Sequence, residues 1–416
     1  MFRKAWRKLF HRTTSTNHLQ KRRVYLDTAA AAPIWPEVVG AMEPYLTVSF
    51  GNPSALHYEG QQARRAVDVA RELVARYLQV KTPGVTFTSG GTESNNLAII
   101  GYLKSLHAKG RSYDSMEVLS TYIEHPATSK TLAEIATWGV VIKYVPVNQE
   151  GLIDIVQLES LLTEQTVLLT TARCNSEIGV LQPTQKIARI LKKFTTRMNL
   201  DPIVLHIDAA QTPLWESCHM AALGADMISL DAGKFGGPKG IGVLACRQPL
   251  VTQGIAYGGG QEAGLRPGTE AVAQIVGFAT AFKIAQDGVE KRTQVVAALQ
   301  QLGLELLREM LPGAVLNGPE GESRIVNNLN FSLPGYDTEY AAIVLDTAGF
   351  AVSTKSACSS IDSSASDVVM VITNNVERAR STLRITLHEA ITRQDLQRLF
   401  TVLQDHTQKM REYTQV

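Results

Sequence analysis

Short apolar runs alternate with amphipathic stretches from residue 60 to residue 245, and this alternation limits the possible folds more than any other feature. We expect strands at 85–88, 117–120, 140–145, 167–171, 203–207, 227–230 and 242–245. Stretches between them, including 60–78, 93–107, 129–137 and 185–194, have the apolar spacing of helices. The alternation predicts an α/β fold with a mostly parallel, doubly wound sheet. Such sheets bind ligands beyond the carboxyl ends of their strands.

The pattern changes after about residue 285. A helical run at 289–310, short strands at 328–332, 351–353 and 383–386, and a closing helix at 393–413 predict a smaller α+β domain. We therefore divide the chain into a basic tail at 1–23, a large domain at 45–284, and a small domain made of 24–44 and 285–416. Residues 353–366 are rich in Ser, Thr and Ala, which predicts a mobile loop in the small domain.

Composition excludes several classes of protein. The net charge of the 416 residues is only +2, which gives no indication of a nucleic-acid partner. The four cysteines form no CxxC pair and have no metal-ligand spacing, so we expect no metal site and a reducing compartment, the cytoplasm. No apolar run reaches the ~18 residues that a membrane span requires.

The N-terminal tail is the exception to this ordinary composition. Residues 1–23 contain no acid and many Arg and Lys residues, with Phe2, Trp6, Leu9 and Phe10 near helical spacing. Three interpretations stay open: a basic tail on a cytoplasmic protein, an organelle-targeting segment, or a basic helix that binds surfaces.

One strand-like run ends at Asp208, and a later one leads into the glycine-rich segment that contains Lys234. Pyridoxal 5'-phosphate (PLP) needs both residue types: a lysine forms a Schiff base with its aldehyde, and an acid keeps its pyridine nitrogen protonated. Lys239 is a rival for the lysine, but the Gly240-Ile241-Gly242 that follows it indicates a turn. A phosphate-binding P-loop is excluded, because Phe235 stands where Ser or Thr should follow the lysine.

Two further motifs follow strands. Gly91 and Thr92 open a helix after a glycine turn, where backbone N–H groups and the Thr92 hydroxyl can bind a phosphate; a simple helix cap is the alternative. His125 follows the next strand and is either structural or, in a PLP site, a proton carrier that stacks on the ring.

The small domain contributes two candidates. Cys358 lies among small polar residues in the 353–366 loop, which is a poor environment for a buried structural thiol. Lys355 nearby favours its ionisation, which a nucleophilic thiol needs. Arg384 has apolar neighbours, so it is either ion-paired or reserved for a substrate carboxylate.

Together these motifs resemble the cysteine desulfurases of the NifS/IscS-like branch, which have the class V aminotransferase fold. The resemblance extends from Val24 to about Phe400 and keeps one order along the chain. It rests on 25–27, 51–54, 87–98, 124–125, 177–180, 206–211, 234–242, 258–262, 266–269, 356–358 and 383–384. The Cys358-to-Arg384 spacing, 384 − 358 = 26, resembles the group with a long loop that can carry a persulfide outward. The implied fold is that of a fold-type I PLP-dependent transferase.

The resemblance also implies a role for each site residue. Lys234 holds PLP, Asp208 pairs with the ring nitrogen, His125 stacks on the ring, and Gln211 faces the ring oxygen. The implied phosphate contacts are Gly91, Thr92 and, from the partner subunit of a homodimer, Thr269. Arg384, with Asn52 close by, binds the carboxylate of L-cysteine. The Cys358 thiolate attacks the substrate sulfur and keeps it as a persulfide for an acceptor protein, either an iron–sulfur scaffold or a tRNA-thiolation protein.

The chain departs from the family at the cofactor. Asp231-Ala232-Gly233 stands where the family has Ser-Gly-His before the lysine, so an acid replaces a hydroxyl expected near the phosphate. Ser176 falls where an Asn contacts the ring oxygen, and Thr28 replaces another Asn. Each change predicts weaker or retuned cofactor binding.

Two alternative functions remain. A selenocysteine lyase shares the fold and nearly the same motifs. A degenerate PLP-fold scaffold, which binds partners without turnover, would explain the changes at Asp231, Gly233 and Ser176.

Overall fold

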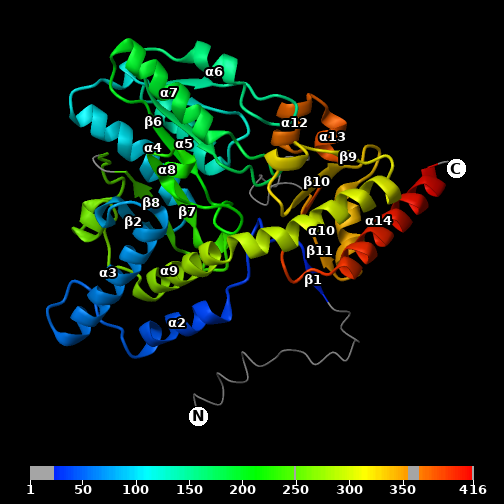
Figure 1. Ribbon diagram of the computed structural model, residues 1–416, viewed down its shortest axis with the longest axis horizontal. Helices are drawn as coiled ribbons and strands as arrows, with labels where there is room; N and C mark the ends of the chain where they lie inside the picture. The colour runs from blue at the N-terminus through cyan, green and yellow to red at the C-terminus, as the bar shows by residue number, and fades with distance from the viewer. Residues whose placement is uncertain (1–22, 248–249, 355–364, 415–416) are drawn as a thin grey trace.

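The computed structural model describes residues 23–247, 250–354 and 365–414, which form two domains (Figure 1). The large domain contains a seven-stranded sheet in the order β2-β8-β7-β6-β5-β3-β4. Its strands are β2 (Val85–Thr88), β3 (Glu117–Ser120), β4 (Val141–Tyr144), β5 (Thr166–Ala172), β6 (Val204–Asp208), β7 (Met227–Asp231) and β8 (Gly242–Cys246). All neighbours pair in parallel except that β8 is antiparallel to both β2 and β7. The predicted mostly parallel α/β sheet is confirmed.

Helices pack on both faces of this sheet because its strands are apolar on both sides. Adjacent residues alternate between faces: Leu169 and Leu205 join one hydrophobic cluster, and Leu168 and Val204 join another. The helices of this domain are α2 (Pro36–Thr47), α3 (Tyr58–Leu78), α4 (Gly91–Ala108), α5 (Pro126–Ala136), α6 (Ile155–Leu161), α7 (Thr184–Met198), α8 (Met220–Leu223) and α9 (Val272–Asp287). Helices α2, α3, α7 and α9 contribute to the first cluster, and α4 and α5 to the second.

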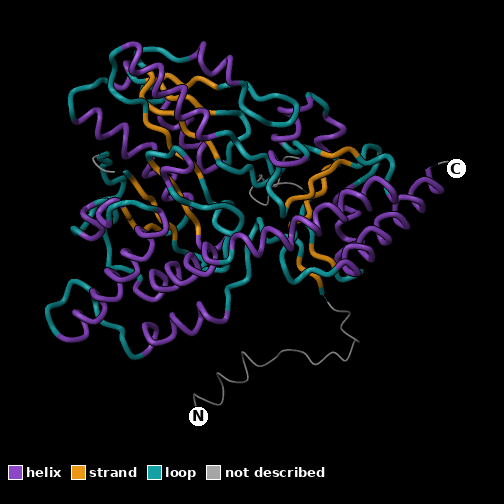
Figure 2. Tube along the Cα trace, viewed as in Figure 1, coloured by secondary structure: helices purple, strands orange, loops and turns teal. Residues whose placement is uncertain are grey.

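The small domain combines short strands with helices. Long helix α10 (Val289–Met310) follows α9 and extends from one domain to the other (Figure 1). A three-stranded sheet has the order β12-β10-β9, and a separate pair joins β1 with β11. The elements are β1 (Val24–Tyr25), β9 (Val315–Leu316), β10 (Asn328–Ser332), α11 (Thr338–Thr347), β11 (Phe350–Ala351), α12 (Asp367–Thr373), α13 (Val376–Arg380), β12 (Thr382–Thr386) and α14 (Arg393–Thr414). The strands form two groups in Figure 2, one for each domain.

The segment 24–44 divides its contacts between the domains. Val24 and Leu26 pack in the hydrophobic cluster of the small domain, whereas Val38 and Met42 of α2 pack in the large-domain cluster. By packing, the part of this segment from Pro36 onward therefore belongs with the large domain.

A search of the described helices finds none with the length and hydropathy of a membrane-spanning segment.

Candidate functional site

A cavity of about 220 Å³ lies at the carboxyl ends of the parallel strands, where sheets of this kind bind ligands. Loops after β2, β3, β5, β6 and β7 form its large-domain walls, and β12 closes it from the small domain. Of the residues predicted from the sequence, eight line it: Gly91, Thr92, His125, Ser176, Asp208, Gln211, Lys234 and Arg384. The fold thus gathers most of the predicted site in one place.

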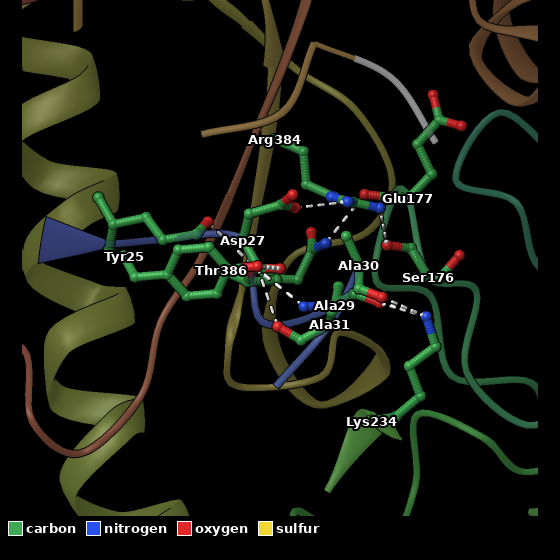
Figure 3. Close-up of polar contacts among 12 residues, drawn as sticks. Tyr25, Asp27, Ala29, Ala30, Ala31, Ser176, Glu177, Lys234, Arg384 and Thr386 are labelled. Carbon is green, nitrogen blue, oxygen red and sulfur yellow. Dashed lines mark hydrogen bonds and ion pairs between the residues drawn. The ribbon is translucent and has the colours of Figure 1, made fainter. Parts of the chain in front are cut away.

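Lys234 ends a short 3-10 turn (Ala232–Lys234) directly after β7. Its Nζ donates hydrogen bonds to the carbonyl oxygens of Ala29, at 3.1 Å, and Ala30, at 2.6 Å (Figure 3). These carbonyls hold the amine at the cavity wall. The rival Lys239 is exposed and does not line this cavity, so the geometry favours Lys234.

Asp208 is the last residue of β6, and its carboxylate is held from two sides. Asn95 Nδ2 donates to Oδ2 at 2.7 Å, and the backbone N–H of Ala210 donates to Oδ1 at 3.0 Å. Asn95 lies on α4, lines the cavity, and has a buried Oδ1 without a hydrogen-bond partner among the described residues. Sequence analysis missed Asn95, although it stands in the same motif as Thr92.

His125 caps the N-terminus of α5. Its Nδ1 accepts a hydrogen bond from the backbone N–H of Ala127 at 3.0 Å. Burial lowers the pKa of this imidazole; the nearby Asp208 carboxylate opposes the shift, and the Lys234 ammonium adds to it. The neutral ring therefore carries its proton on Nε2, since Nδ1 already serves as an acceptor. Such a ring can exchange a proton at Nε2 near neutral pH.

Glu124, which precedes His125 in the same sequence motif but received no role from it, is a buried carboxyl of the cavity wall. It accepts hydrogen bonds from the hydroxyls of Thr121, at 2.7 Å, and Thr171, at 2.9 Å, and from the Ala172 N–H at 2.7 Å. Burial raises its pKa to about 7, against the lowering effect of these hydrogen bonds. Glu124 thereby ties the loop after β3 to the end of β5.

We expect Glu124→Gln to flatten the pH dependence of stability. A carboxyl with a higher pKa in the folded chain binds its proton more tightly there. Its contribution is fully present below the ordinary pKa of 4.5 and is lost as pH rises through about 7. The difference between the ordinary pKa of 4.5 and the raised pKa of about 7 corresponds to about 3 kcal/mol of unfolding free energy. The measurement is the unfolding free energy of wild type and of Glu124→Gln in urea, at pH values from 4.5 to 8. A stability difference that does not change with pH would contradict the expectation.

Arg384 enters the cavity from β12 and is 2% exposed. One terminal nitrogen pairs with Asp27 Oδ1 at 2.7 Å, and the other donates to the Ser176 carbonyl at 3.1 Å (Figure 3). Its Nε is buried and has no hydrogen-bond partner among the described residues. A buried guanidinium with a spare donor can take a carboxylate ligand in addition to Asp27. Both sequence-based readings, ion pairing and carboxylate binding, therefore remain compatible with its geometry.

The phosphate end of the expected cofactor is where the chain is unusual. Helix α4 begins at Gly91, after Gly90, whose φ of 150° suits glycine. The Gly91 N–H donates to Asp231 Oδ2 at 3.0 Å, and the Gly233 N–H donates to Asp231 Oδ1 at 2.9 Å. The chain's own carboxylate therefore takes an amide that the family resemblance assigns to a phosphate.

Apart from Gln211, the predicted residues not yet described do not line the cavity in the described part of the chain. Asn52 and Thr269 are exposed and do not line this chain's cavity. Gln211 lines the cavity, and its Nε2 donates to the Ala29 carbonyl at 3.0 Å. Cys358 lies outside the described residues, as do residues 355–364 of the loop predicted at 353–366 and residues 1–22 of the tail predicted at 1–23.

Comparison with known proteins gives a consistent result. The model of the family Aminotransferase class-V matches residues 24–399. The chain is 36% identical over 391 residues to "Cysteine desulfurase IscS" of Dictyoglomus turgidum, covering 94% of this chain and 96% of that protein. It is 34% identical to "Cysteine desulfurase IscS 1" of Archaeoglobus fulgidus, covering 93% and 97%.

Solved structures are similar over most of their length. One titled "NIFS-LIKE PROTEIN" has a TM-score of 0.84 and 29% identity, and the match covers 93% of this chain and 99% of that one. Another, titled "SspA in complex with cysteine", has a TM-score of 0.73 and 30% identity, covering 87% and 98%.

Proposed function

Since the chain belongs to the Aminotransferase class-V family, we propose that it is a PLP-dependent cysteine desulfurase. The net reaction converts L-cysteine and the Cys358 thiol into L-alanine and a Cys358 persulfide, so sulfur leaves the substrate carbon and bonds to the enzyme sulfur. One observation carries the proposal: Lys234, Asp208, His125 and Arg384 come from four separate segments and line one cavity. This set provides an amine for an aldehyde, an acid for a ring nitrogen, an imidazole and a carboxylate receptor.

The residues at the ring end of the cavity fit the cofactor. Lys234 would hold its aldehyde, and Asp208, oriented by Asn95 and the Ala210 N–H, would receive the pyridine N–H. When bound, PLP supplies an electron sink for the electron pair released at the substrate. His125, with its proton on Nε2, would stack on the ring and carry protons at that atom. Gln211 and Ser176 also line the cavity.

Arg384 would bind the substrate carboxylate. Its side chain lines the cavity, and Asp27 and the Ser176 carbonyl fix its orientation. A fixed guanidinium places the carboxylate of L-cysteine at a defined point and so orients the rest of the small substrate. The exposed Asn52 is not part of this chain's cavity, so its proposed role near the carboxylate requires a second subunit.

Cys358 would receive the sulfur. It lies outside the described residues, but both flanks of its segment are attached beside the cavity. Ser353 exchanges backbone hydrogen bonds with Arg384, and Ser366 Oγ bonds Glu177 of the cavity wall. These attachments support a thiol that reaches substrate and then an acceptor.

We expect Cys358→Ala to lower sulfide release from L-cysteine at least ~100-fold, since the nucleophile is lost. Cys174→Ala is the matched control, because Cys174 lines the same cavity but is buried, and burial raises the pKa of its thiol. Sulfide release is measured with dithiothreitol present. Undiminished release by the Cys358 variant would defeat the persulfide mechanism. Turnover confined to L-selenocysteine would instead support the lyase.

We also propose that the enzyme is a homodimer. Large apolar side chains are exposed at the end of α2 and the start of α3: Leu46, Val48, Phe50, Leu56 and Tyr58, with Phe50 74% and Leu56 90% exposed. A patch of this kind marks an interaction surface. A second copy over it would also account for the exposed Thr269 as a phosphate contact from the partner subunit. A solution mass of one chain would contradict this.

The acceptor of the persulfide would be another protein, an iron–sulfur scaffold or a tRNA-thiolation protein. The cytoplasm is the proposed compartment, because Cys174, Cys218 and Cys246 are buried free thiols rather than disulfides. An organelle address in residues 1–22, which lie outside the described residues, is the alternative.

A further inference from the structure

We propose that Asp231 fills the phosphate subsite of this enzyme and sets its cofactor selectivity: the carboxylate lowers the affinity for PLP and leaves the affinity for dephosphorylated pyridoxal nearly unchanged. This inference rests on the proposed function, because it concerns the cofactor of that same cavity.

The Asp231 carboxylate is bound in the way that an anionic ligand would be. Its two oxygens accept separate backbone N–H groups, from Gly91 at 3.0 Å and Gly233 at 2.9 Å. Gly91 is the first residue of α4, so its amide lies at the positive end of an 18-residue helix. A helix N-terminus with free N–H groups is a common phosphate site. Here the chain supplies the anion itself.

Gly233 makes this arrangement possible. A Cβ on Gly233 would lie only 3.2 Å from Asp231 Oδ1, so a larger residue would crowd the carboxylate. A Cβ on Gly91 would lie 3.4 Å from Asp231 Oδ2, so the carboxylate packs directly against the helix start. The acid at 231 and the glycine at 233 therefore act together, and the two departures from the family pattern form one structural change.

A phosphate cannot use the Gly91 amide while Asp231 holds it. The phosphate must displace the carboxylate and then remain close to it, and two anions at one subsite repel each other. Each lost charge-assisted hydrogen bond weakens binding about 10- to 100-fold. Pyridoxal has the same ring and aldehyde but no phosphate, so it meets Lys234 and Asp208 without this conflict. The affinity advantage of PLP over pyridoxal should therefore be small in this enzyme.

The test measures dissociation constants of PLP and pyridoxal for the apo form of the full chain, by titrating the Lys234-dependent visible absorbance band. We expect Asp231→Asn and Asp231→Ser to bind PLP about 10- to 100-fold more tightly than wild type, with pyridoxal affinity within about 3-fold. Asn keeps the shape of the side chain, and Ser is the residue that the family pattern has. Either variant that folds serves the test, and near-UV circular dichroism checks folding.

Glu93→Gln is the matched control. Glu93 lies in the first turn of α4, where its carboxylate accepts the Ser89 N–H at 2.6 Å and pairs with Arg266 at 3.4 Å. The Gly91 N–H, in contrast, is donated to Asp231. Glu93→Gln takes one negative charge from the same helix end, and we expect PLP affinity to change less than about 3-fold. If Glu93→Gln gains as much PLP affinity as the Asp231 variants, the gain comes from the loss of any negative charge near the helix start, and the inference is overturned.

The outcomes separate this inference from the proposed function. PLP affinity that is unchanged in both Asp231 variants, or that changes in parallel with pyridoxal affinity, overturns the role of Asp231 alone. If neither ligand produces a band that Lys234→Ala abolishes, in wild type or in any variant, the proposed function fails and the inference fails with it.

Discussion

We expect Lys234→Ala to lose the visible cofactor band and to lower L-cysteine turnover at least ~1,000-fold. The amine is the only group of the described cavity wall that is suited to hold an aldehyde, and the carbonyls of Ala29 and Ala30 hold it in place. Absorbance spectra of the purified proteins and alanine formation from L-cysteine measure the two effects. The alanine side chain leaves the two carbonyls without this donor.

Lys239→Ala is the control for this experiment, because Lys239 lies in the same glycine-rich segment but is exposed and outside the cavity. It should keep both the band and the turnover. A band that survives in the Lys234 variant and disappears in the Lys239 variant would exchange the two assignments. A colourless wild-type protein that added PLP does not colour would favour the degenerate scaffold.

The large domain could be predicted because its strands are short apolar runs bounded by turn residues. The bounds of β2 and β3 agree with the prediction. Those of β4, β5 and β6 differ from it by one residue at both ends, and those of β7 and β8 by one residue at the C-terminal end. Helix α9 was missed. Its buried residues lie on several faces, from Val272 to Ala285, so it lacks the polar stripe that reveals a surface helix.

The cavity could be predicted in outline but not in its contacts. Asp208 ends a strand, and His125 and Lys234 follow strands. The carboxyl ends of parallel strands meet at one edge of the sheet, which brings the three residues together. Asp231 was recognised as a departure from the family pattern. Its bond to Gly91 spans 140 residues and depends on the side-chain orientation, which no local pattern encodes.

The pairing of Arg384 with Asp27 illustrates the same limit over 357 residues. The sequence context of Arg384 left ion pairing and carboxylate binding equally open. The structure shows the ion pair and, in addition, a buried Nε without a partner among the described residues. Ion pairing and carboxylate binding are therefore compatible. Asp27 positions the guanidinium, and the substrate carboxylate would accept hydrogen bonds from the N–H groups that Asp27 leaves available.

We expect Arg384→Ala to raise the KM for L-cysteine at least ~100-fold while the cofactor band remains, because a buried charge pair with the substrate carboxylate is lost. Arg384→Lys keeps the charge but not the planar fork, so its KM should lie between those of wild type and Arg384→Ala. Steady-state kinetics with L-cysteine and cofactor absorbance are the two measurements. No described hydrogen bond joins Arg384 to Lys234 or Asp208, so the absorbance band of the cofactor should not change in these variants.

Arg384→Ala also leaves Asp27 without its ion-pair partner, and removing one member of a buried ion pair can cost about 3–5 kcal/mol of stability. Asp27→Asn separates the two effects. It keeps the guanidinium and can still accept its hydrogen bond, so we expect it to lower stability while raising the KM less than about 10-fold. If Arg384→Ala lowers stability but leaves the KM unchanged, Arg384 is a structural ion-pair partner. The carboxylate receptor must then be sought at the interface of the proposed homodimer, where the exposed Asn52 would be the first candidate.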